Sequence, residues 1–354
     1  MKDFYQKYQV YFPAAFFFGG FLFDLLTTDR IDHSFALIQQ LIYILLIFIL
    51  FYWEVVTPQK FLRENSWLNK MWQFHVEALH FLFGSLLSLY TIFYFKSSSN
   101  LYSWIFMFFL AGLLVINELP RFQKRGLLIR SLLLCLCVLS YLIYLVPVIT
   151  GSIGWLSFLL STALTVSVYI LYVRFIVNKI QHEKPEVKSL YYGLLIPLVF
   201  VILYTLKILP PVPVSIKHIG IYHHIEKQNG QYVLSYERPW WAFWQSGAQT
   251  FVNREGDKIH CFVSIFSPTQ FRDRMQLVWY KWHKDGWQKR DSVPIEIRGG
   301  RDQGFRGFAY KSNFEKGHWQ VRVVTSDERE VGRIGLNVVL TDDNSVREWK
   351  QDLF

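Results

Sequence analysis

An uncharged apolar segment that ends in a group of prolines divides this chain into two parts. Leu190–Leu206 contains no charged side chain, and a helix of this length approaches the roughly 30 Å of a bilayer core at about 1.5 Å per residue. Pro210, Pro211 and Pro213 follow closely, and proline both lacks a backbone donor and restricts the residue before it. We therefore expect a membrane-spanning helix to end here, with membrane segments before it and a water-soluble domain after it.

Seven apolar runs lie before or at this boundary. Hydrophobic residues make up 52% of the 354 residues, more than an ordinary soluble protein contains. The runs near spanning length are Phe12–Thr28, Phe35–Val56, Phe74–Phe95, Leu101–Leu119, Leu127–Ile149, Trp155–Val177 and Leu190–Leu209. We predict an α-helical polytopic bundle of seven transmembrane helices over residues 1–209, followed by a proline-rich junction over residues 210–218.

The distribution of lysine and arginine predicts the orientation of this bundle. Basic residues cluster before the first run and after the second, fourth and sixth runs, whereas the alternate connections hold only Arg30 and Lys96. By the positive-inside rule the N-terminus is then cytoplasmic, and seven crossings place the residues after 210 on the opposite side of the membrane. Charged residues follow the first run in place of a small-residue cleavage site, so we expect an uncleaved helix.

A few ionisable side chains interrupt the apolar runs. They are Asp24, Glu54, Glu77, His80, Glu118 and Arg130. Charges in hydrocarbon cost several kcal/mol unless they are paired or hydrated, so these residues should face one another or water. Two interpretations stay open: a proton relay or polar substrate site around Glu77, His80 and Glu118, or ion pairs with Arg121, Lys124 or Arg130 that lock helix packing. A metal site built on Glu77 and His80 would need a second copy of the motif, which the sequence lacks, so we expect neither a metal nor a cofactor.

After the junction the apolar pattern changes to a period of two. Alternating segments cover Tyr232–Tyr236, Ile259–Ile265, Leu277–Lys281, Val293–Ile297, Trp319–Val323 and Ile334–Leu340. Turn signals such as Asn229-Gly230 and Asp285-Gly286 separate them. We predict an all-β antiparallel sandwich of seven or eight strands over residues 219–340. The tail over residues 341–354 would either dock as a short helix or fray.

Several short motifs in this region point to a known family. They are Trp279-Tyr280-Lys281-Trp282, Gly286-Trp287, the glycine-rich run Gly299–Gly307, Gly317–Val323 and Val331–Gly335. With these motifs, residues Ile219–Leu340 resemble the domain-of-unknown-function family 2914, which is found at the C-terminus of bacterial envelope proteins. The resemblance implies a fold and an envelope setting, and no catalytic residue. Together with the orientation, it predicts a multi-pass protein of the bacterial inner (cytoplasmic) membrane with a periplasmic C-terminal domain.

Aromatic residues form one candidate binding surface of this domain. Tyr280, Trp282 and Trp287 would offer faces on which sugar rings stack. Strand alternation, however, directs half of the rings in such a segment into the core. Whether these three rings point outward therefore stays open.

Two further surfaces are suggested by composition. Arg298, Arg301 and Arg306 with Asp302 lie beside flexible glycines and would either hold an anionic glycan, phosphate or lipid headgroup or form internal ion pairs of a long hairpin. Trp240, Trp241 and Trp244 follow soon after the last apolar run. They suit either the membrane interface or packing within the protein.

No catalytic pattern stands out in the sequence. It contains no recognisable Ser/His/Asp order, paired catalytic carboxylates or phosphate loop, and its net charge of +10 is not accompanied by a nucleic-acid motif. The leading hypothesis is a β domain that binds an envelope glycan, lipid headgroup or envelope protein without catalysis, anchored by the bundle in the lipid bilayer. The alternative is a membrane-embedded enzyme or transporter that uses Glu77, His80 and Glu118.

Overall fold

The chain divides into two compact units in the computed structural model. The structure describes residues 34–56, 75–98, 126–180, 185–268, 272–298, 304–341 and 347–354, and single positions at 72 and between 104 and 113. The first unit is helical and extends to Leu209, and the second unit holds Pro210–Phe354 and two short connecting segments of the helical part. The apolar run Phe12–Thr28 and most of Leu101–Leu119 lie outside the described residues.

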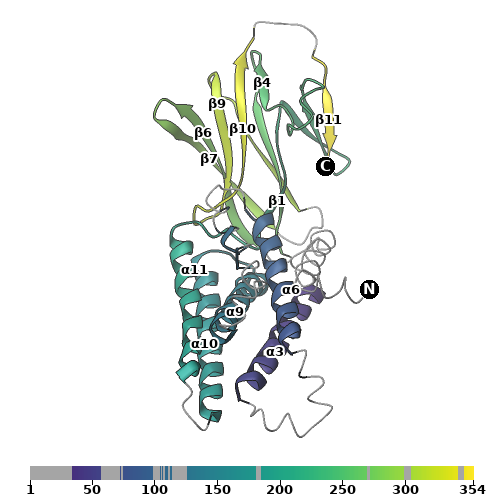
Figure 1. Ribbon diagram of the computed structural model, residues 1–354. Helices are drawn as coiled ribbons and strands as arrows, with labels where there is room; N and C mark the ends of the chain where they lie inside the picture. The colour runs from purple at the N-terminus through teal and green to yellow at the C-terminus, as the bar shows by residue number, and fades with distance from the viewer. Residues whose placement is uncertain are drawn as a thin grey trace, which may run out of the picture. The chain divides into compact units, whose positions relative to one another are not determined.

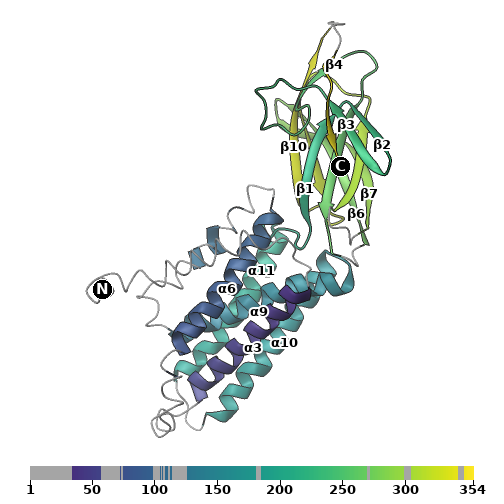
Figure 2. The ribbon, with the colours of Figure 1, turned by 90° about the vertical axis from the view of Figure 1, so that its right-hand side faces the viewer.

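The helical unit consists of long apolar helices that run alongside one another (Figures 1 and 2). They are α3 (Ser34–Val56), α6 (His75–Lys96), α9 (Gly126–Thr150), α10 (Trp155–Lys179) and α11 (Leu195–Thr205), with the 3-10 helix η2 (Pro185–Leu194) leading into α11. Within the described part of the chain, five segments are long and apolar enough to cross a membrane. Five of the seven predicted spans therefore have helices of suitable length, and a bundle of seven is not confirmed.

Burial differs strongly between these helices. In α6 and α9, 72% of the most apolar window is buried, against 22% in α3 and 33% in α10. The outer helices instead expose large apolar side chains, including Phe35 at 71%, Leu156 at 81% and Leu171 at 66%. Such surfaces are unfavourable in water and favourable in hydrocarbon, as expected of helices that contact lipid.

The predicted small-residue stripe of α10 lies at a close helix contact. Ser157, Ser161 and Thr165 are all buried. The Ser161 hydroxyl donates to the Leu142 carbonyl of α9 at 3.0 Å, a contact that only a small side chain permits.

Helix α11 ends before the proline cluster is reached. Its last residue is Thr205, and Lys207 has a left-handed backbone with φ of 56°. The Leu206 N–H donates to the Ile202 carbonyl and the Ile208 N–H to the Leu203 carbonyl, each at 3.0 Å. These bonds satisfy two of the last carbonyls of the helix, so its C-terminal end is capped by the backbone that follows. The prolines prevent it from resuming.

The described residues of the second unit form three sheets. The strands are β1 (Ser215–Tyr222), β2 (His224–Gln228), β3 (Gln231–Tyr236), β4 (Thr250–Asn253), β5 (Ile259–Phe266), β6 (Arg272–His283), β7 (Gly286–Arg298), β8 (Phe305–Lys311), β9 (Gly317–Val324), β10 (Glu330–Leu340) and β11 (Lys350–Leu353). The strand orders are β1-β5-β8, β4-β10-β9-β6-β7 and β11-β3-β2, and Figure 1 shows β6, β7, β9 and β10 side by side. The sheets are antiparallel as predicted, apart from the parallel pair β4–β10.

Buried side chains from all three sheets form one core cluster, which includes Leu234 of β3. Cys261 and Val263 of β5 join Leu277 of β6 and Val321 of β9, all fully buried, as the alternation predicted. Strand β5 is also buried on its other face, where the ring of Phe262 contacts Tyr232 at 5.5 Å and Phe354 at 5.2 Å between centroids. The third sheet supplies this cover.

The C-terminal residues form a strand where the sequence suggested a short helix. Strand β11 pairs antiparallel with the edge of β3. Just before it, the Arg347 guanidinium donates to Asp257 at 2.9 Å and to the Val252 carbonyl at 3.0 Å. Because the unsatisfied edge of β3 offers backbone partners, pairing wins over local helix formation. At the other end, β1 already begins at Ser215, inside the expected junction.

A buried histidine leads to a prediction about acid stability. His223 stacks on Phe251 at 4.2 Å, and burial together with the charge of Arg347 lowers its pKa from 6.5 to about 4. An unfolded chain takes up this proton near pH 6.5 and the folded chain only near pH 4. We therefore expect the free energy of unfolding to fall as the pH drops through this interval.

Urea denaturation of the full chain in detergent, followed by tryptophan fluorescence between pH 7.5 and 4.5, measures this loss. His223→Phe keeps a ring against Phe251 and should flatten part of the pH dependence, whereas the exposed-site control His224→Phe should retain it. Equal pH dependence in His223→Phe and the unmodified protein would contradict the prediction.

Candidate functional site

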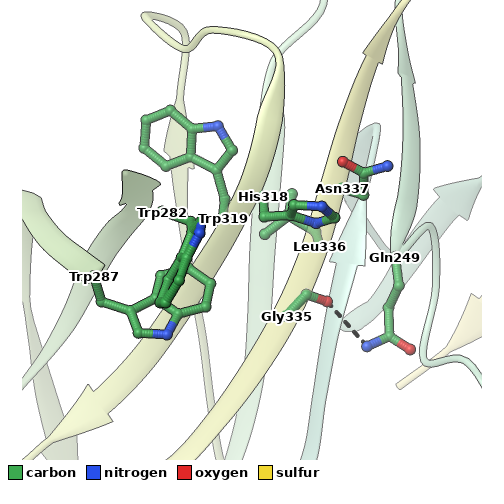
Figure 3. A pocket seen from close by; sticks show the side chains of 8 residues that line it. All are labelled: Gln249, Trp282, Trp287, His318, Trp319, Gly335, Leu336 and Asn337. Atoms are coloured by element: carbon green, nitrogen blue, oxygen red, sulfur yellow. Dashed lines mark hydrogen bonds between the residues drawn. The ribbon is translucent and has the colours of Figure 1, made fainter. Parts of the chain in front are cut away.

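A groove of about 490 Å³ opens on the five-stranded sheet. The residues that line it are Gln249, Trp282, Trp287, His318, Trp319, Gly335, Leu336 and Asn337. Figure 3 shows Trp282 and Trp287 at one end of the groove and Gln249 at the other. An apolar concave surface with a few convergent polar groups is typical of a ligand-binding site.

Two tryptophans of the β6–β7 hairpin form one end of the groove. Trp282 and Trp287 are direct cross-strand partners, with ring centroids 5.1 Å apart in an edge-to-face arrangement. They are 48% and 37% exposed, whereas Trp279 and Trp319 are 1% and 3% exposed. Of the three rings whose direction the sequence left open, Trp282 and Trp287 thus point outward and Tyr280 is partly buried, whereas Trp279 and Trp319 belong to the core.

A β-bulge is the reason that Trp287 points outward. Trp287 is separated from Val293, Ile295 and Ile297 of β7 by even numbers of positions. Strict alternation would therefore turn Trp287 to the same side as these residues, toward the core. Pairing shifts, however, from Trp279 opposite Asp291 to Tyr280 opposite Lys289, which leaves Arg290 as an extra residue. Such a bulge reverses the direction of the side chains beyond it.

The hollow of the groove depends on a glycine in β10. Gly335 is exposed, and a Cβ built on it would come no closer than 4.0 Å to the Trp319 carbonyl oxygen. A side chain at this position would therefore fit the strand but would occupy the groove. Next to the hollow, His318 and Asn337 are direct cross-strand partners, and buried Leu336 closes its inner side.

Gln249 reaches the groove because of a close backbone approach before β4. Gly247 has φ of 70°, and a Cβ there would lie 2.0 Å from the Ile221 carbonyl oxygen, so only glycine fits. This approach lets the Ala248 N–H donate to the Ile221 carbonyl at 2.7 Å. The Gln249 side-chain amide then donates to the Gly335 carbonyl at 3.0 Å.

The chemistry of the groove is that of recognition. The eight lining residues include no carboxylate and no hydroxyl or thiol nucleophile. They offer two exposed indole rings, the His318 imidazole and the side-chain amides of Gln249 and Asn337. The two amides are uncharged and both donate and accept hydrogen bonds. Such a surface suits a ligand with an apolar face and hydroxyl or amide edges.

The other predicted residues of the β domain lie elsewhere or are not described. Tyr280 is partly buried, with the Arg322 guanidinium 4.2 Å from its ring centroid. Arg306 lies on β8 in a different sheet and lines a smaller groove with Lys217 and His218. Arg301 and Asp302 fall outside the described residues, as does the side chain of Arg298.

Two of the predicted polar residues of the helical unit, Glu54 and Arg130, form an ion pair. The Arg130 guanidinium of α9 donates to the Glu54 carboxylate of α3, which is the helix-locking arrangement. His80 is partly buried on α6, and the side chain of Glu77 on the same helix is outside the described residues, as are Asp24 and Glu118. Among the described residues, no three His, Cys, Asp or Glu side chains come close enough to hold a metal ion.

The hydrogen-bonding residues of the groove were missed by sequence reasoning. Gln249, His318 and Asn337 come from separate segments, and no spacing in the sequence links them. Two weak signals exist: His318 lies within one of the motifs that carry the family resemblance, and Asn337 interrupts an apolar strand.

The family comparison coincides with this groove. Residues 274–338 match the family described as Protein of unknown function (DUF2914). The matched segment runs from β6 to β10, the C-terminal half of the region that showed the resemblance. It contains every lining residue except Gln249.

Comparisons with solved structures give weak likenesses. An immunoglobulin-like protein from Pseudomonas aeruginosa is 14% identical over 36% of this chain and 98% of its own, with a TM-score of 0.22. A β-glucosidase from Listeria innocua in complex with gluconolactone is 12% identical over 32% of this chain and 16% of its own, with a TM-score of 0.19. No curated protein matches the sequence.

The Glu54–Arg130 ion pair leads to a stability prediction. Arg130→Leu leaves the Glu54 carboxylate without its partner in a largely apolar setting, which should cost about 3 kcal/mol of stability. Glu54→Leu/Arg130→Leu removes both charges and should recover most of this loss. Unfolding of the full chain in mixed micelles with increasing dodecyl sulfate, followed by circular dichroism, measures both variants. A double variant as unstable as the single one would show that the ion pair is not the cause.

Proposed function

We propose that this protein is a non-catalytic glycan-binding protein of the bacterial inner membrane. The helical unit anchors the chain, and the β domain presents the groove at Trp282 and Trp287 on the periplasmic side. The ligand is an envelope glycan that lies along the groove.

The tryptophan pair beside the Gly335 hollow is the observation that carries this proposal. A pyranose ring has an apolar face of C–H groups and an edge of hydroxyls, so it matches an indole face bordered by amides and an imidazole. Trp282 and Trp287 are 48% and 37% exposed in the free protein. Covering that apolar surface with a ligand is favourable by about 25 cal/mol per Å².

Anchorage is supported by the helical unit and by the charge pattern. Among the described residues, five segments are apolar and long enough to cross a bilayer, and the basic residues of the sequence cluster in alternate connections. By the positive-inside rule, this pattern supports a cytoplasmic N-terminus and a periplasmic β domain. The absence of a carboxylate from the eight lining residues favours binding over hydrolysis.

Glycan binding by the full chain in lipid nanodiscs tests the proposal. The probes are oligomers of the peptidoglycan disaccharide, chitohexaose and maltohexaose, each titrated by isothermal calorimetry. We expect at least one probe to bind, and Trp287→Ala to weaken it at least tenfold, or about 1.4 kcal/mol. Gly335→Phe should abolish binding because its side chain fills the hollow, whereas the smaller Gly335→Ala should bind more nearly normally.

The matched control is Trp240→Ala, which removes a tryptophan that is 86% exposed and outside the groove. It should leave glycan affinity unchanged. The proposal is wrong if no probe binds, or if binding survives both Trp287→Ala and Gly335→Phe.

A further inference from the structure

The turn between β3 and β4 exposes four large aromatic side chains within five residues. Trp240, Trp241, Phe243 and Trp244 are 86%, 53%, 79% and 63% exposed, and Ala242 between them is buried. We call residues 238–245 the aromatic turn. It contains no acidic residue, and neither the groove nor the core uses its rings.

The aromatic turn is held in shape by hydrogen bonds among its own residues. The Ala242 N–H donates to the Pro239 carbonyl at 3.2 Å, and the Gln245 N–H donates to the Ala242 carbonyl at 3.1 Å. The Arg238 guanidinium donates to the Gln245 carbonyl and closes the turn. The exposure of the rings is therefore a property of a defined turn.

A second contact ties the turn to the sheet. The Lys350 ammonium of β11 donates to the Arg238 carbonyl at 2.9 Å. The Arg238 guanidinium also lies 5.0 Å from the ring centroid of Tyr236 in β3. Arg238 and Lys350 thus contact protein groups at the base of the turn, whereas the four aromatic rings of the turn are exposed.

The rings form a cluster that suits a lipid surface. Trp244 lies 5.7 Å from Trp241 and 5.2 Å from Phe243 between ring centroids. Tryptophan prefers the membrane interface because its ring is apolar and its indole N–H can donate to headgroups. Among the described residues of the same chain, five segments are apolar and long enough to cross a membrane, and a bilayer that they span would be held at high local concentration near the β domain.

We propose that the aromatic turn inserts into the interface of the bilayer that the helices of this chain span. The ligand of this surface is the lipid headgroup and upper acyl region. The insertion is a second attachment of the β domain to the membrane, in addition to the chain connection. It depends on the membrane helices and not on the glycan groove.

Depth-dependent fluorescence quenching tests this insertion in the full chain. Phe243→Cys is labelled with the environment-sensitive dye NBD, because Cys135, Cys137 and Cys261 are buried and an unsubstituted sample measures their background. The protein is placed one copy per nanodisc of phosphatidylethanolamine and phosphatidylglycerol, with or without lipid that carries a spin label at acyl carbon 5. We expect a blue-shifted emission that the spin-labelled lipid quenches at least twofold.

Three variants make the result specific. The label at Lys284→Cys, on the exposed β6–β7 turn, should be quenched much less. Replacing Trp240, Trp241 and Trp244 with alanine should at least halve the quenching at position 243. Because these three rings are exposed, the replacement removes no side chain from the core. Trp287→Ala, which tests the groove, should leave the quenching unchanged.

Two outcomes would overturn the proposal. The first is equal quenching at positions 243 and 284, because the contact would then not belong to the aromatic turn. The second is a blue shift that spin-labelled lipid does not quench in single-copy nanodiscs, because a protein surface and not lipid would then cover the rings.

Discussion

The β domain depends on the burial of both faces of β5. Seven of its eight residues are buried and one is intermediate, with β1 and β8 as antiparallel neighbours. Cys261 faces the core shared with the five-stranded sheet, and Phe262 on the opposite face lies against Tyr232 and Phe354. A strand in this position needs cover on two sides. The C-terminal strand β11 and the β2–β3 hairpin are therefore part of the fold and not additions to it.

The groove follows from the way the five-stranded sheet meets this core. Trp279 and Trp319 fill the inner side, so the outward side of the same strands is free to carry polar and aromatic groups. The bulge at Arg290 then brings Trp287 to the same side as Trp282, and Gly335 keeps the space beside them empty. Groove and core are thus two faces of one set of strands, and the family match covers the same segment.

The two units form their backbone hydrogen bonds in different ways. In hydrocarbon no water is available for backbone hydrogen bonds, so the apolar half is helical and closes its bonds locally. After Leu209 the chain forms sheets whose bonds join distant residues, including the parallel pair β4–β10. The charged side chains follow the same division: Glu54 and Arg130 neutralise each other among apolar helices, whereas Arg347 and Asp257 join the C-terminal segment to the β4–β5 turn.

The sequence by itself determined the class of each half and the position of the boundary. Uncharged runs of spanning length imply helices, and period-two patterns with Asn-Gly and Asp-Gly turns imply antiparallel strands. Indeed, Asn229 and Gly230 both have positive φ, as a tight hairpin turn requires. These signals are local, because each residue's preference is set by its neighbours in the chain and by the solvent it meets.

Only the tertiary structure decided which rings face outward and which residues meet. Strict alternation places Trp287 in the core, and a single extra residue in the strand reverses it. Gln249, His318 and Asn337 come together through strand pairing over long sequence distances, and the tail becomes a strand because β3 has an open edge. Pairing register and edge availability are properties of the assembled sheet, so no local pattern in the sequence records them.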